Sequence, residues 1–216
     1  DTIQPTIVCP ATVIQTADPG KCGADVIFAA PISNDNCGVF AVINDYNGNV
    51  SATDFYPVGT THVLYDVVDV NGNHNMSCSF DVTITDNEFP VFVCPSNITT
   101  NVASGFCSKT VNFNVSVTDN CTTLIPTRTQ GLASGAVFPL GITTETFVAT
   151  DASGNQSTCT FTVTVVDTIK PGIVCPSNQV FNATTGLCSR NVTIAVPVTN
   201  DNCSVVSVVN NITGTN

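Results

Sequence analysis

Positive charge is scarce in this chain. Five Lys and Arg residues stand against 16 Asp and Glu residues, which leaves a net charge of −11. A chain this acidic is repelled by phosphate backbones and by anionic lipid surfaces, so we expect no nucleic-acid partner. It also lacks an apolar run of about 18 residues, so we expect no membrane insertion.

Groups suited to catalysis are equally rare. The two histidines, His62 and His74, fall in predicted surface strand or turn segments. The sequence contains no G-x-S-x-G, H-E-x-x-H or P-loop motif. With no Trp and three Tyr, it offers little for a sugar-stacking platform. We therefore predict no catalytic residues and no enzymatic activity.

Cysteine, by contrast, is abundant, and the eleven cysteines recur with a period of 81 to 85 residues. Four positions in the period carry them: Cys9, Cys94 and Cys175; Cys22, Cys107 and Cys188; Cys37, Cys121 and Cys203; Cys78 and Cys159. A repeat of this length indicates a tandem array of small modules. We predict repeats over residues 1–85 and 86–166 and a partial third repeat over residues 167–216.

Within each repeat, apolar and polar residues alternate with the period of two that is typical of half-buried strands. The clearest segments are Cys78–Ile84, Val111–Val117, Cys159–Val165 and Val192–Val198. We interpret the short apolar run Val26–Phe28 as core. About seven short strands per repeat predict an all-β fold of tandem immunoglobulin-like β-sandwich repeats stacked end to end.

The ordered motifs resemble the hyalin repeat, or HYR, domain family. They are Val-Cys-Pro, Gly-x-Cys, Asp-Asn-Cys, an aromatic residue followed by Pro-x-Gly, Asp-x-x-Gly-Asn and Cys-x-Phe-x-Val-Thr, in that order in both full repeats. The resemblance implies an immunoglobulin-like fold in extracellular or cell-surface proteins, with roles in cell adhesion and matrix. It assigns no catalytic residues.

Cysteines at fixed phase in an acidic chain of extracellular type indicate disulfide bonds, with free buried thiols as the alternative. In an immunoglobulin-like sandwich, the start of the first strand and the residue after the last hairpin lie at the same end. We therefore predict the bonds Cys9–Cys78 and Cys94–Cys159 within the two full repeats.

The second and third cysteines of each repeat lie at opposite ends of one predicted strand, too far apart for the roughly 6 Å that a disulfide spans. One hypothesis is inter-repeat bonding, Cys22–Cys121 and Cys107–Cys203, which would reinforce the array covalently. The alternative is bonding within the repeat, Cys22–Cys37 and Cys107–Cys121, with both flanking loops folded back.

Aspartates also recur at the repeat boundaries, where carboxylate oxygens would suit Ca²⁺. The candidate calcium ligands are Asp1, Asp35, Asp69, Asp86, Asp119, Asp151, Asp167 and Asp201. The alternative is that these residues cap backbone amides in turns without any metal. Apart from calcium, we expect no cofactor.

Asn-x-Ser/Thr sequences are frequent and would accept N-glycans if the source is eukaryotic. The candidates are Asn49, Asn75, Asn97, Asn114, Asn155, Asn182, Asn191 and Asn211. Asn120 and Asn202 match the motif as well, but they adjoin cysteines expected to be bonded and are poor acceptors.

The function expected from these features is structural: a segment of an extracellular fibre or of a surface or matrix protein, reinforced by disulfides. Its expected partners are further copies of its own repeats, in a homopolymer or bundled filament. One alternative is an adhesion module that binds a protein or glycan through variable loops such as Asn44–Asn49 and Pro126–Ala133. Another is a stalk for a domain outside these residues.

Overall fold

The computed structural model describes residues 1–209, and this part of the chain contains strands and no helix. The strands of the first repeat are β1 (Thr6–Val8), β2 (Val13–Thr16), β3 (Gly23–Val26), β4 (Ile32–Asn34), β5 (Val39–Asn44), β6 (Asp54–Pro57), β7 (Gly59–Asp69) and β8 (His74–Thr85). Because residues 1–209 contain no helix, they include no helix long and apolar enough to cross a membrane.

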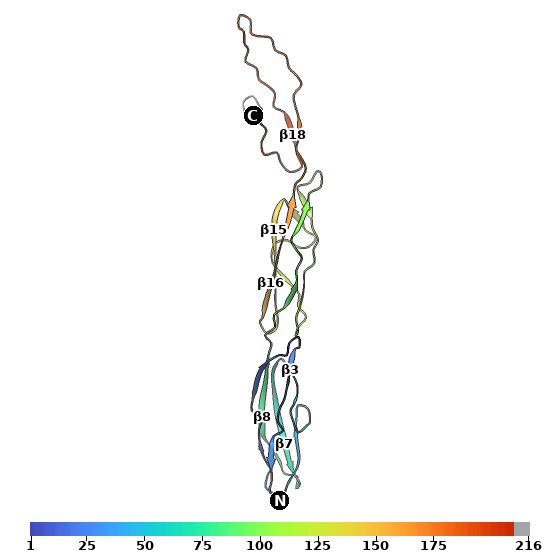
Figure 1. The fold of residues 1–216 in the computed structure, drawn as a ribbon, viewed down its shortest axis with the longest axis vertical. Coiled ribbons are helices and arrows are strands. Elements are labelled where there is room, and N and C mark those ends of the chain that lie inside the picture. The colour runs from blue at the N-terminus through green and yellow to red at the C-terminus, as the bar shows by residue number, and fades with distance from the viewer. Residues whose placement is uncertain (210–216) are drawn as a thin grey trace. The chain divides into compact units, whose positions relative to one another are not determined.

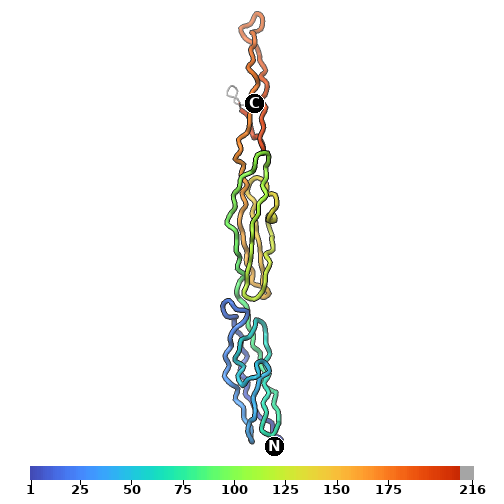
Figure 2. The backbone as a smooth tube through the Cα atoms, turned by 90° about the vertical axis from the view of Figure 1, so that its right-hand side faces the viewer, coloured from blue at the N-terminus to red at the C-terminus, as the bar shows by residue number. Residues whose placement is uncertain are grey.

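The first repeat is a two-layered sandwich. One layer is a four-stranded sheet in the order β2-β8-β7-β5, and the other is formed by the pairs β1-β4 and β3-β6. Strand β2, blue in Figures 1 and 2, runs parallel to β8, with Val13 opposite Val82. Strands β3 and β4 belong to different pairs, β3-β6 and β1-β4, and are separated by residues 27–31, which include Pro31. Proline cannot donate a hydrogen bond to the sheet, so pairing lapses there.

The alternating pattern of β7 and β8 places one face of the sheet in the core. Val63, Tyr65 and Val67 of β7 are fully buried, and Phe80 and Val82 of β8 lie on the same inner face. At about 25 cal/mol per Å² of buried apolar surface, burial of such side chains is the main force that holds the two layers together. The period of two therefore predicted this face correctly.

The interpretation of Val26–Phe28 as core is wrong at its centre. Val26 and Phe28 are buried, but Ile27 between them is 86% exposed. Neighbouring side chains of an extended segment point to opposite faces, so three consecutive residues cannot all face the same core.

The second repeat has the same topology. Its strands are β9 (Val91–Val93), β10 (Ile98–Asn101), β11 (Ser108–Thr110), β12 (Ser116–Thr118), β13 (Thr127–Gln130), β14 (Val137–Pro139), β15 (Gly141–Thr150) and β16 (Gln156–Val166). A four-stranded sheet in the order β10-β16-β15-β13 faces the pairs β11-β14 and β12-β9. Its core contains an aromatic cluster in which the Phe113 ring lies 5.0 Å from that of Phe161 and 6.1 Å from that of Phe147.

The third repeat contributes one described pair, β17 (Gly172–Val174) and β18 (Val198–Asn200). Residues 192–198 were predicted to form a half-buried strand, but Val192, Ile194 and Val196 are exposed and lie outside any strand. In the second repeat the corresponding face is covered by strands of the four-stranded sheet, and residues 167–209 contain no such sheet.

The described chain divides into two compact units. The first comprises Asp1–Val93 with Ser116–Thr127 and Val148–Thr158, and the second comprises Cys94–Val115, Arg128–Phe147 and the described chain from Cys159 onward. The first repeat and one end of the second repeat thus belong to the same unit. The all-β, immunoglobulin-like sandwich fold is confirmed, and the end-to-end stacking of repeats stays a prediction.

Candidate functional site: a carboxylate cluster beside an inter-repeat disulfide

Residues 1–209 contain four disulfides. Two lie within repeats, Cys9–Cys78 and Cys94–Cys159, with Cα atoms 5.4 and 5.9 Å apart. Two join the second cysteine of one repeat to the third cysteine of the next, Cys22–Cys121 and Cys107–Cys203, with Cα atoms 4.5 and 4.9 Å apart. All four Cα separations lie within the range that a disulfide spans.

The alternative pairing Cys22–Cys37 does not occur in this structure, in which Cys37 is free and exposed. Cys22 ends a tight loop in which Lys21 N donates to Asp18 O at 2.9 Å, and Gly20 has a φ of +72°. Glycine adopts this left-handed conformation without a steric cost. The loop thereby turns the Cys22 side chain toward Cys121 of the second repeat.

Three aspartates of the first unit converge next to this disulfide. Asp86 follows β8, Asp119 follows β12 and Asp151 follows β15. One carboxylate oxygen from each lies within 4.8 Å of the others. Asp86 and Asp151 are buried, and Asp119 is half-buried. Three carboxylates at this separation repel one another, and partial burial strengthens the repulsion.

Backbone amides fix the orientation of all three carboxylates. Asp119 Oδ2 accepts hydrogen bonds from the amides of Cys121 and Thr122, each 3.0 Å long. Asp151 Oδ1 accepts from the amides of Ser153 and Asn155, at 2.9 and 2.8 Å. Asp86 Oδ1 accepts from Glu88 N at 3.1 Å. As proposed in the alternative to calcium, each aspartate thus organises a turn.

Turn formation leaves several oxygens of the site unused. Asp86 Oδ2, Asp119 Oδ1 and the side-chain carbonyl Oδ1 of Asn120 are buried and have no hydrogen-bond partner among the described residues. Buried polar atoms are nearly always paired, and leaving one unpaired costs about 1–3 kcal/mol. Turn capping alone does not account for these oxygens, whereas a cation bound among them would.

The ionisation of Asp151 favours such a site. Burial opposes ionisation of this carboxyl, but hydrogen bonds from the Asn155 side chain and from nearby backbone amides outweigh burial and lower its pKa. Asp69, at the equivalent turn of the first repeat, has its pKa lowered by the same balance, with Asn73 as the donor. Both carboxylates are therefore charged at neutral pH.

The donor set suits a hard divalent cation. Asp86, Asp119, Asp151 and Asn120 supply oxygens, and the nearby Cys121 sulfur is engaged in a disulfide. Ca²⁺ takes six to eight oxygen ligands, whereas zinc sites are built mainly from nitrogen and sulfur. The protein side chains would provide part of this shell, with water completing it.

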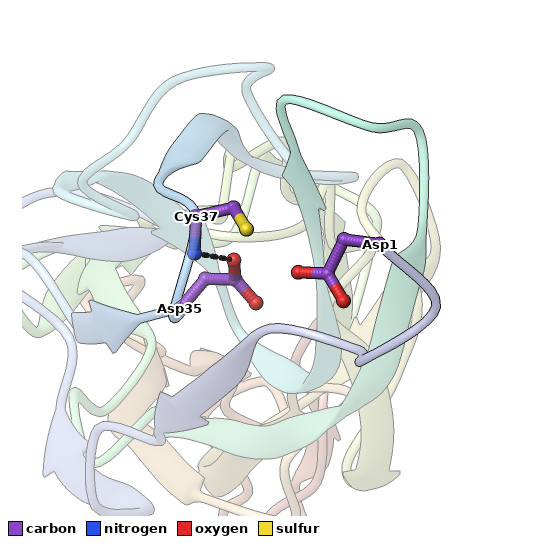
Figure 3. A group of neighbouring side chains, drawn as sticks. All are labelled: Asp1, Asp35 and Cys37. Carbon is purple, nitrogen blue, oxygen red and sulfur yellow. Dashed lines mark hydrogen bonds between the residues drawn. The ribbon is translucent and has the colours of Figure 1, made fainter.

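The other predicted ligands are gathered less completely. Asp1 and Asp35 form a group with Cys37, and Figure 3 shows the Asp1 carboxylate facing both of these residues. Asp69 stays outside this group, although Asn73 links it to the Asp1 backbone carbonyl at 3.2 Å. Asp167 and Asp201 do not come together with a third ligand among residues 1–209.

Sequence reasoning missed the asparagines of the three Asp-Asn-Cys motifs. Asn120 Nδ2 donates to Lys21 O at 3.0 Å and to Asp86 Oδ1 at 3.2 Å, while its Oδ1 is one of the unpaired oxygens. Asn202 repeats this arrangement with a hydrogen bond of 2.9 Å to Phe106 O and an unpaired Oδ1. The signal was the recurrence of Asn at the same position in all three repeats.

The candidate glycan acceptors differ in accessibility. Asn49, Asn97, Asn114, Asn182 and Asn191 are exposed. The amide nitrogens of Asn75 and Asn155 already donate hydrogen bonds to the backbone carbonyls of Pro5 and Asp86. Asn211 lies outside the described residues.

The two histidines are exposed on strands, each beside an aspartate.

Comparison with known proteins identifies the family. The HYR domain matches residues 1–84 and 85–165. Hyalin of Strongylocentrotus purpuratus is 34% identical over 211 residues, covering 93% of this chain and 17% of its own length. Hyalin of Lytechinus variegatus is also 34% identical, over 83% of this chain and 34% of its own length.

A more distant relative, 27% identical over 160 residues, is the Sushi, von Willebrand factor type A, EGF and pentraxin domain-containing protein 1 of Rattus norvegicus. The alignment covers 74% of this chain and 4% of that protein. The chain thus spans about a third or less of the length of these relatives.

Among solved structures, the protocadherin gammaB7 EC3-6 cis-dimer matches with a TM-score of 0.39 and 15% identity, over 94% of this chain and 62% of that chain. Human CDH23 EC21-23 matches with a TM-score of 0.36 and 14% identity, over 94% of this chain and 81% of that chain.

The matched repeats, the hyalin relatives and the four disulfides together mark an extracellular or cell-surface repeat protein of adhesion type. On the two HYR matches, the chain belongs to the HYR domain family.

Proposed function

We propose that this chain is a structural segment of an extracellular fibre or matrix array, in which consecutive HYR repeats are linked both covalently and by calcium. The observation that carries the proposal is the recurrence of one cross-link: Cys22–Cys121 and Cys107–Cys203 occupy the same positions in successive repeats. A disulfide that recurs once per repeat transmits tension along an array in addition to the backbone.

The absence of catalytic motifs from the sequence agrees with a load-carrying function. In a load-carrying array, the expected partners are further copies of the same repeat in a homopolymer or bundled fibre. Electron micrographs of the native protein, taken from its source without reducing agent, test this function directly. Filaments or sheets with a regular repeat are expected, and isolated molecules at all concentrations would contradict the proposal.

Calcium is the second part of the proposal. Three mutually repelling carboxylates lie beside the Cys22–Cys121 bond, and one oxygen each of Asp86 and Asp119, together with Asn120 Oδ1, is buried and unpaired. A divalent cation there would neutralise the carboxylates and give the unpaired oxygens a partner, thereby stabilising the segment that carries the cross-link. Ligands that bind only the folded state raise its stability in proportion to the logarithm of their concentration.

Calorimetric titration with CaCl₂ and thermal melts in CaCl₂ or EGTA test the calcium site. We expect a higher melting temperature in calcium and at least about tenfold weaker binding in Asp119→Asn, because a ligand charge is lost. Asp54→Asn, which removes an exposed carboxylate outside the cluster, is the matched control and should bind as the wild type does. Identical melts in CaCl₂ and EGTA would rule out a calcium function.

A further inference from the structure

The three Asp-Asn-Cys motifs form the same local turn. The backbone amide of the cysteine donates to the aspartate Oδ2 at 2.8 Å in Asp35–Cys37, 3.0 Å in Asp119–Cys121 and 3.2 Å in Asp201–Cys203. In each turn the asparagine Nδ2 also lies within 3.5 Å of the cysteine Sγ. Each turn therefore presents an amide donor and a sulfur side by side.

Two of these turns hold a Gly-x-Cys loop from the preceding repeat. Asn120 donates to Lys21 O, and Asn202 donates to Phe106 O, the carbonyl just before the loop cysteine in both cases. The loop cysteine itself then bonds to the cysteine of the turn. The structure thus shows the same receiving turn with the same kind of occupant twice.

The first turn, Asp35–Cys37, has the same shape and no occupant among the described residues. Cys37 is free and exposed, whereas Cys121 and Cys203 are half-buried. Asp35 Oδ1 is buried and unpaired, as is Oδ1 of Asp119 and of Asp201. Figure 3 shows the Cys37 sulfur and the Asp35 carboxylate of this turn.

A loop of the occupant type is also free in this chain. Leu187 N donates to Thr184 O at 2.8 Å, and Gly186 has a φ of +83°. In the bonded loop before Cys107, Phe106 N donates to Ala103 O at 3.1 Å, and Gly105 has a φ of +84°. The free loop ends at Cys188, which is exposed and unbonded.

We propose that the Asp35–Cys37 turn is the receiving half of a covalent joint, and that its occupant is the Gly186–Cys188 loop of a second copy of this chain. The joint rests on the proposed array function and extends it from one chain to its assembly. Asn36 would donate to the carbonyl of Leu187 as Asn120 does to that of Lys21, and Cys37 would bond to Cys188. Because turn and loop lie in different repeats, the contact is head-to-tail and can be repeated from copy to copy, which gives an open chain of copies or a closed ring.

Bond formation requires an oxidant, which a low-molecular-weight disulfide such as oxidised glutathione supplies. The thiolate of one cysteine attacks glutathione disulfide, forms a mixed disulfide and releases one glutathione thiolate. The thiolate of the other cysteine then attacks the protein sulfur of the mixed disulfide and displaces the second glutathione. The two protein thiols are oxidised to one disulfide, and one glutathione disulfide is reduced to two glutathione thiols.

The test uses the 216-residue chain in glutathione buffer, with Cys175→Ser in every variant to remove the third free thiol. This background should form a ladder of disulfide-linked oligomers on non-reducing gels. Adding Cys37→Ser leaves only the loop, and adding Cys188→Ser leaves only the turn, so each variant alone should stay monomeric. An equimolar mixture of the two should give dimers alone, with a Cys37–Cys188 peptide on digestion.

A control separates docking from chance oxidation of exposed thiols. Asn36→Ala in the turn-only variant should slow dimer formation roughly two- to tenfold, the effect of one lost hydrogen bond. Asn34→Ala, an exposed position two residues earlier, should not slow it. Equal rates for both variants, symmetric Cys37–Cys37 or Cys188–Cys188 dimers, or no dimer in the mixture would overturn the joint.

The same samples report separately on the proposed function. If the mixture fails to dimerise while calcium binding and the Cys22–Cys121 peptide are present, the joint between chains is wrong and the array proposal stands. If peptide mapping instead finds Cys22 bonded to Cys37, the proposed recurring cross-link is wrong and the joint falls with it.

Discussion

The side-chain amide of Asn120 donates a hydrogen bond of 3.0 Å to the backbone carbonyl of Lys21, 99 residues earlier in the chain. Cys22 follows Lys21 and Cys121 follows Asn120, and these two cysteines are bonded to each other. A directional hydrogen bond next to the disulfide orients the two backbones, so that the bond joins two segments already held in place.

Loss of the Cys22–Cys121 bond should destabilise the first unit. The bond connects residues 99 apart, and its removal restores conformational entropy to the unfolded chain. We expect Cys22→Ser with Cys121→Ser to lower the unfolding free energy by about 2–4 kcal/mol. Scanning calorimetry without reducing agent measures the change.

Cys37→Ser, which removes a free thiol of the same unit, is the matched control and should melt as the wild type does. Equal melting temperatures for the double variant and this control would show that the bond adds nothing to stability.

Much of the fold was predictable because two full repeats of the chain encode it in the same pattern. The alternation at Cys78–Ile84 follows from the pleat of a strand, and the buried face of β8 agrees with it. The failure at Val192–Val198 has a physical reason as well. Alternation shows which face is apolar, but burial requires an opposing sheet, which a local pattern does not encode.

The carboxylates of the candidate site could be predicted from the sequence, whereas the role of the Asn120 side-chain amide could not. Asp86, Asp119 and Asp151 lie far apart in sequence but share a position relative to strand ends, and sandwich topology brings such positions together. The role of Asn120 depends on which of its two side-chain atoms meets a carbonyl and which stays unpaired, and spacing alone does not determine that.

Tyr56 should make the first repeat sensitive to alkali. Its ring is fully buried, its hydroxyl donates to Ala52 O at 2.7 Å, and burial raises its pKa from 10.0 to about 12, with smaller effects from nearby charges. A raised pKa in the folded state favours folding fully below pH 10.0, and this contribution is lost as the pH rises toward about 12. Stability should therefore fall across this interval.

Urea titrations at several alkaline pH values measure this dependence. In Tyr56→Phe the slope of unfolding free energy against pH should be smaller, although Tyr46 and Tyr65, whose pKa values are also raised by burial, retain part of it. The variant should also lose about 1 kcal/mol at neutral pH from the missing hydrogen bond. An unchanged slope would contradict a coupling between Tyr56 ionisation and folding.

Glycan occupancy should follow the freedom of the asparagine amide. Asn114 is exposed, whereas Asn75 Nδ2 donates to Pro5 O at 2.6 Å within the folded repeat. If the chain is secreted from eukaryotic cells, we expect a glycan on Asn114 and little or none on Asn75. Mass spectrometry after digestion with trypsin and Asp-N, which places Asn75 and Asn114 on separate peptides without another candidate acceptor, measures both sites before and after deglycosylation. Higher occupancy at Asn75 than at Asn114 would contradict this expectation.

The second repeat has a buried carboxylate, Glu145, at a position where the first repeat has none. Glu145 stands where the first repeat has Val63, and both side chains are fully buried. Its Oε1 accepts a hydrogen bond of 2.8 Å from Leu132 N, and the residue before Leu132 is Gly131, with a φ of +89°. A Cβ added at Gly131 would overlap the Glu145 carboxylate.

Gly131→Ala should therefore be destabilised by two effects, left-handed strain and steric overlap. Gly105→Ala provides the control, because Gly105 has a φ of +84° and open space around its Cβ position, so it should cost only the strain of about 1–2 kcal/mol. The excess cost of Gly131→Ala over Gly105→Ala should shrink when Glu145 is also replaced by Ala, since the overlap is then removed. A double-mutant cycle from urea unfolding measures this coupling, and a coupling energy near zero would show that Glu145 does not constrain the Gly131 turn.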